Sequence, residues 1–114
     1  MARYTCSFIV AIPLHQLDQA LIEVLQSCSF DIIYQTPEYM MGREIPGQVS
    51  FAKLVTVEVL IDRTTATERE VRLNCVVKNE ELPLQINNHC WKMFDVLKQA
   101  MSETTHWQLV ESLV

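Results

Sequence analysis

Two neighbouring stretches of the chain alternate apolar and polar residues with the same rhythm. The apolar positions are Val55, Val57, Val59 and Ile61 in the first stretch, and Val71, Leu73, Cys75 and Val77 in the second. A period of two residues is that of a strand with one buried face. Residues 63–67 between the stretches are long enough for a connecting loop. The pattern therefore predicts a hairpin of two long antiparallel strands that share one apolar face.

Two further segments have the period of an amphipathic helix. Apolar residues recur at spacings of three and four between Pro13 and Cys28, and a proline suits the first turn of a helix. Near the end of the chain, Asn87 or Asn88 can cap a second helix that ends near Ser102. The expected buried stripe of this second helix is Cys90, Met93, Phe94, Leu97 and Met101.

Shorter alternating segments add strands to the hairpin. Residues 4–10 and 29–36 alternate as half-buried strands do, and residues 107–114 fit a strand slightly better than another helical turn. Residues 36–48 contain both glycines of the chain and two of its four prolines, which indicates turns and an irregular loop. A short strand at 39–43 is the alternative for this segment.

These elements predict a single α+β domain that spans residues 1–114. The expected order is β-α-β-(β)-β-β-α-β, with an antiparallel sheet of four to six strands and two amphipathic helices on one face. A ferredoxin-like fold or a related two-layer sandwich satisfies this order. With 114 residues and 49% hydrophobic content, the chain can close one compact core.

Charge and hydropathy narrow the classes of partner. Nine basic residues against 14 acidic ones give a net charge of −5, and the basic residues do not cluster, so we expect no nucleic-acid binding. No run approaches the 18 or more apolar residues of a membrane span, so membrane insertion is not expected. The apolar segment after Arg3 lacks the small-residue cleavage pattern of a secretory signal, and we expect a cytoplasmic protein.

Catalytic and metal-binding signals are weak. The four cysteines are widely separated and lack metal-ligand or disulfide-scaffold spacing, so buried free thiols are expected. Cys90 lies beside His89 near a helix N-terminus, where a thiol pKa is lowered, but it shares a helix face with Phe94 and Leu97. A core thiol is therefore the favoured interpretation. The sequence predicts no catalytic residue, no metal site and no cofactor.

The segment 37–47 is the favoured binding element. It carries Tyr39, Met40, Met41, Arg43 and Ile45, and aromatic, Met and Arg residues are enriched at the cores of protein interfaces. We expect a non-enzymatic protein-interaction or assembly module that acts through this loop and an adjoining sheet edge. Alternatively, the two methionines fold back to cap the sheet.

Three other hypotheses stay open from the sequence. The main alternative function is a small apolar-ligand binding domain, with a pocket between sheet and helices. The expected lining of that pocket is Phe8, Tyr34, Val57 and Phe94. The third-ranked function is a small thiol-dependent enzyme that uses Cys90. Homo-oligomerisation is suggested by Leu54 and Leu60, which fall on the polar side of the first hairpin strand, and by an open sheet edge.

Overall fold

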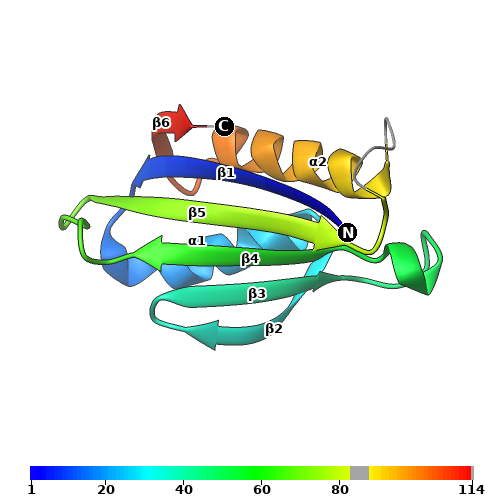
Figure 1. Cartoon of the computed structure of the whole chain (residues 1–114). Coiled ribbons are helices and arrows are strands. Elements are labelled where there is room, and N and C mark those ends of the chain that lie inside the picture. Colours follow the sequence, from blue (N-terminus) through cyan, green and yellow to red (C-terminus); the bar gives the residue numbers. More distant parts are fainter. Residues whose placement is uncertain (83–87, 114) are drawn as a thin grey trace.

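The protein is a two-layer α+β sandwich (Figure 1), and the computed structural model describes residues 1–82 and 88–113. The elements are β1 (Ala2–Ala11), α1 (Leu14–Ser27), β2 (Phe30–Thr36), β3 (Tyr39–Glu44), the short 3-10 helix η1 (Phe51–Lys53), β4 (Thr56–Asp62), β5 (Glu70–Asn79), α2 (His89–Glu103) and β6 (Gln108–Leu113). Six strands form one sheet in the order β2-β3-β4-β5-β1-β6. The predicted fold class is confirmed.

Every neighbouring pair of strands in this sheet is antiparallel. The predicted hairpin is β4 and β5, in which Val57 faces Val77 and Ile61 faces Leu73. Because β5 and β6 both lie antiparallel to β1, they run parallel to each other on either side of it. The connection through α2 is therefore a split βαβ unit, the arrangement expected from the order of elements.

Both helices pack on the apolar face of the sheet. The buried residues of α1 are Leu17, Ala20, Leu21, Val24 and Leu25, and those of α2 are Cys90, Phe94, Leu97 and Met101. Pro13 lies immediately before α1 rather than within its first turn. The Asn88 side chain caps α2, as one of the two candidates, by accepting a hydrogen bond from the Trp91 N–H at 2.7 Å. Asn87, the other candidate cap, lies outside the described residues.

The favoured expectation of turns and an irregular loop at 36–48 is wrong for most of this segment, and the alternative of a short strand at 39–43 is confirmed by the interior strand β3. Gly42 belongs to the strand rather than to a turn, and a Cβ at this position would lie 3.0 Å from a Val57 methyl group and 3.2 Å from the Phe30 Cβ. A residue without a side chain therefore lets β2 and β4 pack closely across β3. Only Gly47, with φ of +127°, adopts the turn conformation that glycine commonly signals.

The last strand, β6, confirms the prediction for the C-terminal segment. It adds to the outer edge of β1, and Leu109 packs partly against the core. Trp107, just before the strand, is buried and its indole N–H donates to the Met101 carbonyl at 2.9 Å. This bond attaches the start of β6 to the end of α2. Because β6 pairs with the outer side of β1, the two edge strands of the sheet are β2 and β6.

Candidate functional site

One face of the sheet is covered by the helices, whereas no helix of the described chain covers the other. Figure 1 views the sheet from this uncovered side, which we call the outer face, with α1 behind the strands. The side chains on it alternate in sequence with the buried ones. Outward positions of the four inner strands include Tyr39, Met41, Glu58, Leu60, Asn74, Val76, Thr5 and Ser7.

The structure divides the predicted binding residues between two faces. Met40 points inward and is fully buried, so the expectation that it belongs to an exposed loop is wrong. Tyr39, Met41 and Arg43 alternate with it and lie on the outer face. Ile45 follows the end of β3 and stays exposed, while its N–H donates to the Ser29 carbonyl at 2.9 Å. Three of the five residues therefore share one surface.

Four large side chains meet on this surface, and we call them the outer patch: Tyr34, Tyr39, Met41 and Leu60. Tyr34 lies opposite Met41 across β2 and β3, and Tyr39 lies opposite Leu60 across β3 and β4. The two tyrosine rings have their centroids 5.9 Å apart at an interplanar angle of 60°. Tyr34 is 57% exposed and Leu60 is 49% exposed. Apolar side chains of this size are thus contiguous on a face open to solvent.

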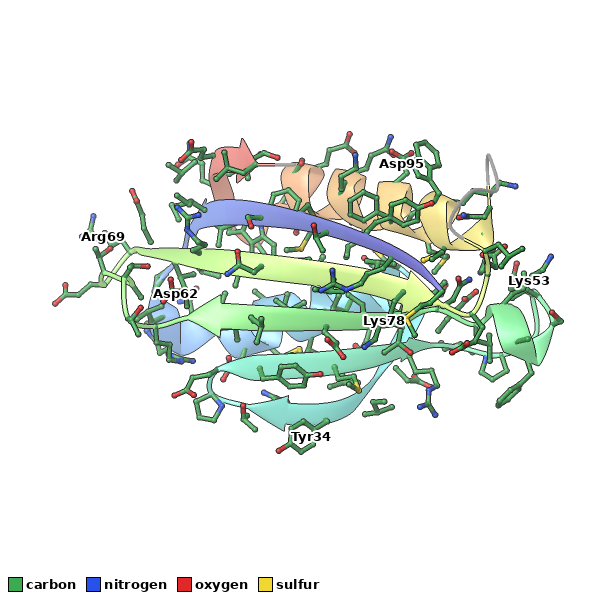
Figure 2. All side chains as sticks on the ribbon, viewed as in Figure 1. Tyr34, Lys53, Asp62, Arg69, Lys78 and Asp95 are labelled. Atoms are coloured by element: carbon green, nitrogen blue, oxygen red, sulfur yellow. The ribbon has the colours of Figure 1, made fainter. Side chains whose placement is uncertain are left out.

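Tyr34 reaches the outer patch because of an irregularity in β2. The register of β2 against β3 shifts between Ile32 and Tyr34. Strict alternation from Phe30 places Tyr34 on the buried side, as we expected from the sequence, but the shift reverses its direction. Figure 2 shows Tyr34 at the β2 margin of the sheet, away from the helices. The residue is therefore a member of the outer patch that sequence reasoning assigned to a different site.

Charged groups border the outer patch. Glu58 lies opposite Met41, and its Oε1 is 3.0 Å from the Lys78 Nζ on β5. Partial burial raises the pKa of the Tyr39 hydroxyl, and the adjacent Glu58 carboxylate adds to this increase. Arg43 is exposed at the end of β3. An apolar centre with a charged border is the usual arrangement of a protein interface.

The adjoining sheet edge is β2, the neighbour of β3. Its edge is not a smooth template for another strand, because the register shift interrupts it and leaves Ile33 exposed. Such irregularities discourage indiscriminate edge-to-edge pairing. Leu60 lies on the outer face as expected, but Leu54 follows η1 and precedes β4, so it is not part of that face. The side chains of the outer patch, rather than the β2 backbone, are therefore the candidate contact surface.

The environment of Cys90 does not suit a nucleophile. Its thiol is fully buried, and its sulfur lies 3.6 Å from the Val77 carbonyl oxygen. Burial, with the nearby carboxylates of Glu81 and Glu44, raises the pKa of Cys90 to about 12. The thiol is thus kept in its neutral, unreactive form at neutral pH.

His89, the neighbour of Cys90 at the start of α2, pairs with a buried carboxylate. Its Nε2 lies 2.8 and 2.9 Å from the two carboxylate oxygens of Glu44, a buried residue at the end of β3. Glu44 also accepts a hydrogen bond from the Val55 N–H at 3.0 Å. The pair joins the end of β3 to the first residue of α2, which is a structural role.

Glu81 holds the N-terminus of α2 from the other side. Its carboxylate accepts hydrogen bonds from the backbone N–H groups of His89 and Cys90, and from the Asn79 side chain. Burial by itself raises the pKa of Glu81, but these hydrogen bonds outweigh it and hold the pKa below its usual value. A carboxylate at this position also interacts favourably with the helix dipole.

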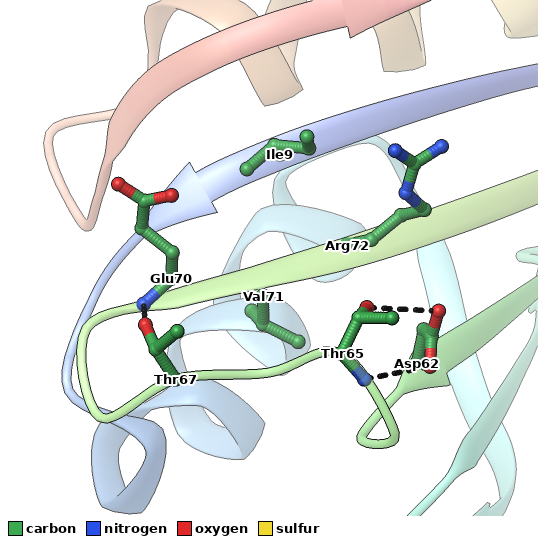
Figure 3. A pocket seen from close by; sticks show the side chains of 7 residues that line it. All are labelled: Ile9, Asp62, Thr65, Thr67, Glu70, Val71 and Arg72. Carbon is green, nitrogen blue, oxygen red and sulfur yellow. Dashed lines mark hydrogen bonds between the residues drawn. The ribbon is translucent and has the colours of Figure 1, made fainter.

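The residues proposed to line an apolar pocket do not converge. Phe8, Val57 and Phe94 are buried among the core residues, whereas Tyr34 lies on the opposite face of the sheet. A depression of about 390 Å³ lies instead on the outer face near the β4–β5 loop (Figure 3). It is open, and its lining mixes apolar side chains with polar ones: the Thr65 hydroxyl donates a hydrogen bond to Asp62, and Glu70 and Arg72 contribute from β5. This site differs from the apolar pocket expected between sheet and helices.

Within residues 1–82 and 88–113, no group of three or more side chains is arranged to hold a metal ion. No helix in the same residues is long and apolar enough to cross a membrane. No protein-family model matches the sequence, and a search of the curated proteins finds no match either.

Proposed function

We propose that this chain is a non-enzymatic protein-interaction or assembly module, and that it docks its partner on the outer patch. The observation that carries the proposal is the joining of two cross-strand pairs, Tyr34 with Met41 and Tyr39 with Leu60, into one exposed apolar surface. Single exposed apolar residues are ordinary on protein surfaces, but contiguous patches with a polar rim mark interaction sites.

Residues of the segment 37–47, the binding element favoured from the sequence, still contribute to the proposed docking surface. Tyr39, Met41 and Arg43 contribute side chains from β3, and Ile45 extends the surface past the end of that strand. Met40 supports the surface from beneath. The edge of β2 adds Tyr34 and Ile33 at one margin. Arg43 and the Glu58–Lys78 pair supply charges that fix the orientation of the partner.

The proposed partner is another protein, and a second copy of this chain is included in that class. The proposal also includes a cytoplasmic location. The proposed location is supported by the four cysteines, which are free thiols buried as small apolar groups. Free thiols of this kind fit a reducing compartment.

A matched pair of variants tests the proposal. The patch variant carries Tyr34→Thr and Leu60→Thr, which remove apolar surface but keep residues that favour strands. The control variant carries Val110→Thr and Leu113→Thr on β6, where the side chains are similarly exposed but lie at the opposite edge of the sheet. Circular dichroism checks that both variants fold.

Association is measured by light scattering of the purified chain and by co-purification from the native source. We expect the patch variant to lose the partner and the control to retain it at the wild-type level. If the patch variant retains every association of the wild type, or if the control loses them equally, the outer patch is not the docking surface.

A further inference from the structure

Segments from different parts of the chain meet at one end of the sheet. Ala2 lies opposite Asn79 there, and Arg43 lies opposite Thr56. We call this the η1 end, and it comprises residues 1–3, 43–56 and 78–82, together with residues 89–92 in the first turn of α2. Figure 1 shows η1 beyond the ends of the strands, at one tip of the molecule.

Exposed apolar side chains concentrate at the η1 end. Among the described residues, the three most exposed large apolar side chains all belong to it: Phe51 is 81% exposed, Leu82 is 67% exposed and Met1 is 59% exposed. Ile45 and Trp91 add two more. Single exposed apolar residues are ordinary, whereas a concentration of them indicates a contact surface.

Hydrogen bonds attach η1 to the body of the protein. The Asn79 side chain donates to the Lys53 carbonyl at 3.0 Å and to the Glu81 carboxylate at 2.6 Å. The Lys53 N–H donates to the Ser50 carbonyl at 2.9 Å and closes the turn. The turn that carries Phe51 is therefore held against the end of β5, while its aromatic side chain points into solvent.

Basic residues that are separate in sequence also come together at the η1 end. Lys78 on β5 lies opposite Arg3 on β1. On its other side Lys78 lies opposite Thr56, and Thr56 lies opposite Arg43 on β3. Like charges directly opposite each other destabilise a strand pair, so the fold alone does not explain this row. Five of the nine basic residues belong to the η1 end: Arg3, Arg43, Lys53, Lys78 and Lys92.

Acidic residues at the η1 end are mostly withdrawn from its surface. Glu44 and Glu81 are buried, and internal hydrogen bonds hold their carboxylates. Glu80 is the exposed acidic residue of this end. Five basic residues thus stand against one exposed carboxylate, although the whole chain has a net charge of −5. The η1 end is therefore a positive tip on an acidic protein.

Neighbouring carboxylates neutralise only part of this positive charge. Glu58 on β4 binds the Lys78 Nζ at 3.0 Å, and Asp31 on β2 lies opposite Arg43. Within residues 1–82 and 88–113, the other three basic residues of the η1 end form no ion pair: Arg3, Lys53 and Lys92.

We propose that the η1 end binds peripherally to the surface of an anionic lipid bilayer, with Phe51 among the headgroups and the basic residues on lipid phosphates. Anionic lipids attract basic residues, and apolar side chains that project from a protein are buried at the boundary between headgroups and acyl chains. A purely acidic protein would match the charges but leave Phe51 and Leu82 in water. A bilayer supplies both anionic groups and an apolar layer.

This surface is distinct from the outer patch, none of whose four residues belongs to the η1 end. Arg43 and Ile45 border both surfaces, so the test uses other residues. Loss of the outer patch should leave lipid binding intact, and loss of Phe51 should leave the protein partner bound. The two proposals therefore fail separately.

Co-sedimentation of the purified full-length chain with unilamellar vesicles tests the proposal. One set of vesicles contains phosphatidylcholine alone, and the other also contains about 30% phosphatidylserine. We expect binding only to the vesicles with phosphatidylserine. Added sodium chloride should weaken this binding, because salt screens the attraction between the basic residues and the lipid phosphates.

Variants at the two ends of the sheet locate the contact. Phe51→Ser should weaken vesicle binding about tenfold or more, since it removes the side chain that leaves water. The double variant Arg3→Gln and Lys53→Gln should weaken it by a similar factor. The matched controls are Val110→Thr, a half-exposed residue of β6, and Arg69→Gln, an exposed residue beyond the other end of the sheet. Both controls should bind vesicles as the wild type does, and circular dichroism checks that every variant folds.

The proposal is overturned if the wild type does not bind phosphatidylserine vesicles at low salt, or if it binds both kinds of vesicle equally. It is also overturned if Phe51→Ser binds as tightly as the wild type, or if the two controls lose as much affinity as the tip variants. Binding to soluble polyglutamate that is as tight as binding to vesicles, and that Phe51→Ser leaves unchanged, would identify an acidic protein as the partner of this end instead.

Discussion

Two adjacent methionines provide a direct test of how β3 is placed. Met40 is fully buried opposite Val59, whereas its neighbour Met41 lies on the outer face opposite Glu58. The substitutions Met40→Ala and Met41→Ala remove the same atoms from consecutive positions. If 37–47 were a surface loop, as the sequence suggested, the two substitutions would cost about the same.

The strand predicts very different costs. Truncation of a buried methionine to alanine removes core contacts and leaves a cavity, for a loss of about 2–5 kcal/mol. That is a large part of the roughly 5–15 kcal/mol that stabilises a typical domain. At the outer position, where solvent already reaches the side chain, the expected cost is below about 1 kcal/mol.

Urea unfolding followed by circular dichroism measures the difference. For an m-value of about 1.5 kcal/mol/M, a loss of 3 kcal/mol lowers the unfolding midpoint by roughly 2 M. We expect this shift for Met40→Ala, and a small shift together with weakened partner association for Met41→Ala. Equal midpoints for the two variants, or a larger loss for Met41→Ala, would refute the assignment of faces.

Three further substitutions probe the supports of the fold. Gly42→Ala should lower the melting temperature, since its methyl group meets Val57 and Phe30 at 3.0 and 3.2 Å and overpacking costs about 1–3 kcal/mol; an unchanged or raised melting temperature contradicts the close approach of β2 and β4. Asn88→Ala removes the cap of α2 and should cost about 1 kcal/mol in urea unfolding. Hydrogen bonds hold the folded-state pKa of Glu81 below its unfolded value of about 4.3, so the stability it contributes is complete above that pH and is lost as the pH falls through the lower folded value. Glu81→Gln should therefore be less stable than wild type at pH 7, and the gap should narrow toward pH 3; a constant gap would contradict this assignment.

Local periodicity was enough to predict most of the architecture. The alternation in Val57–Ile61 and Val71–Val77 reflects burial of one strand face, and burial on one face depends only on side-chain hydrophobicity and strand geometry. The helices followed from the same kind of pattern. Segment 37–47 was harder, because glycine serves both turns and close strand packing, and sequence alone does not distinguish Gly42 from Gly47.

Features that depend on register could not be predicted. Tyr34 changed faces because of one irregularity in β2, which shifts every later side chain of the strand. Cys6 and Cys75 became neighbours only when β1 was placed beside β5 rather than beside another strand. The bond between His89 and Glu44 likewise joins residues from distant segments. Each of these contacts is set by tertiary pairing and leaves no local signal.

Hydrogen exchange tests the central claim most directly, by comparing backbone amides of the free chain with those of the chain bound to the protein that co-purifies with it. If the outer patch is the docking surface, binding should slow exchange at the β2 edge and in the β2–β3 turn, while α2 and β6 exchange at unchanged rates. Slowed exchange confined to α2 or β6 would place the partner on the other side of the molecule and contradict the account.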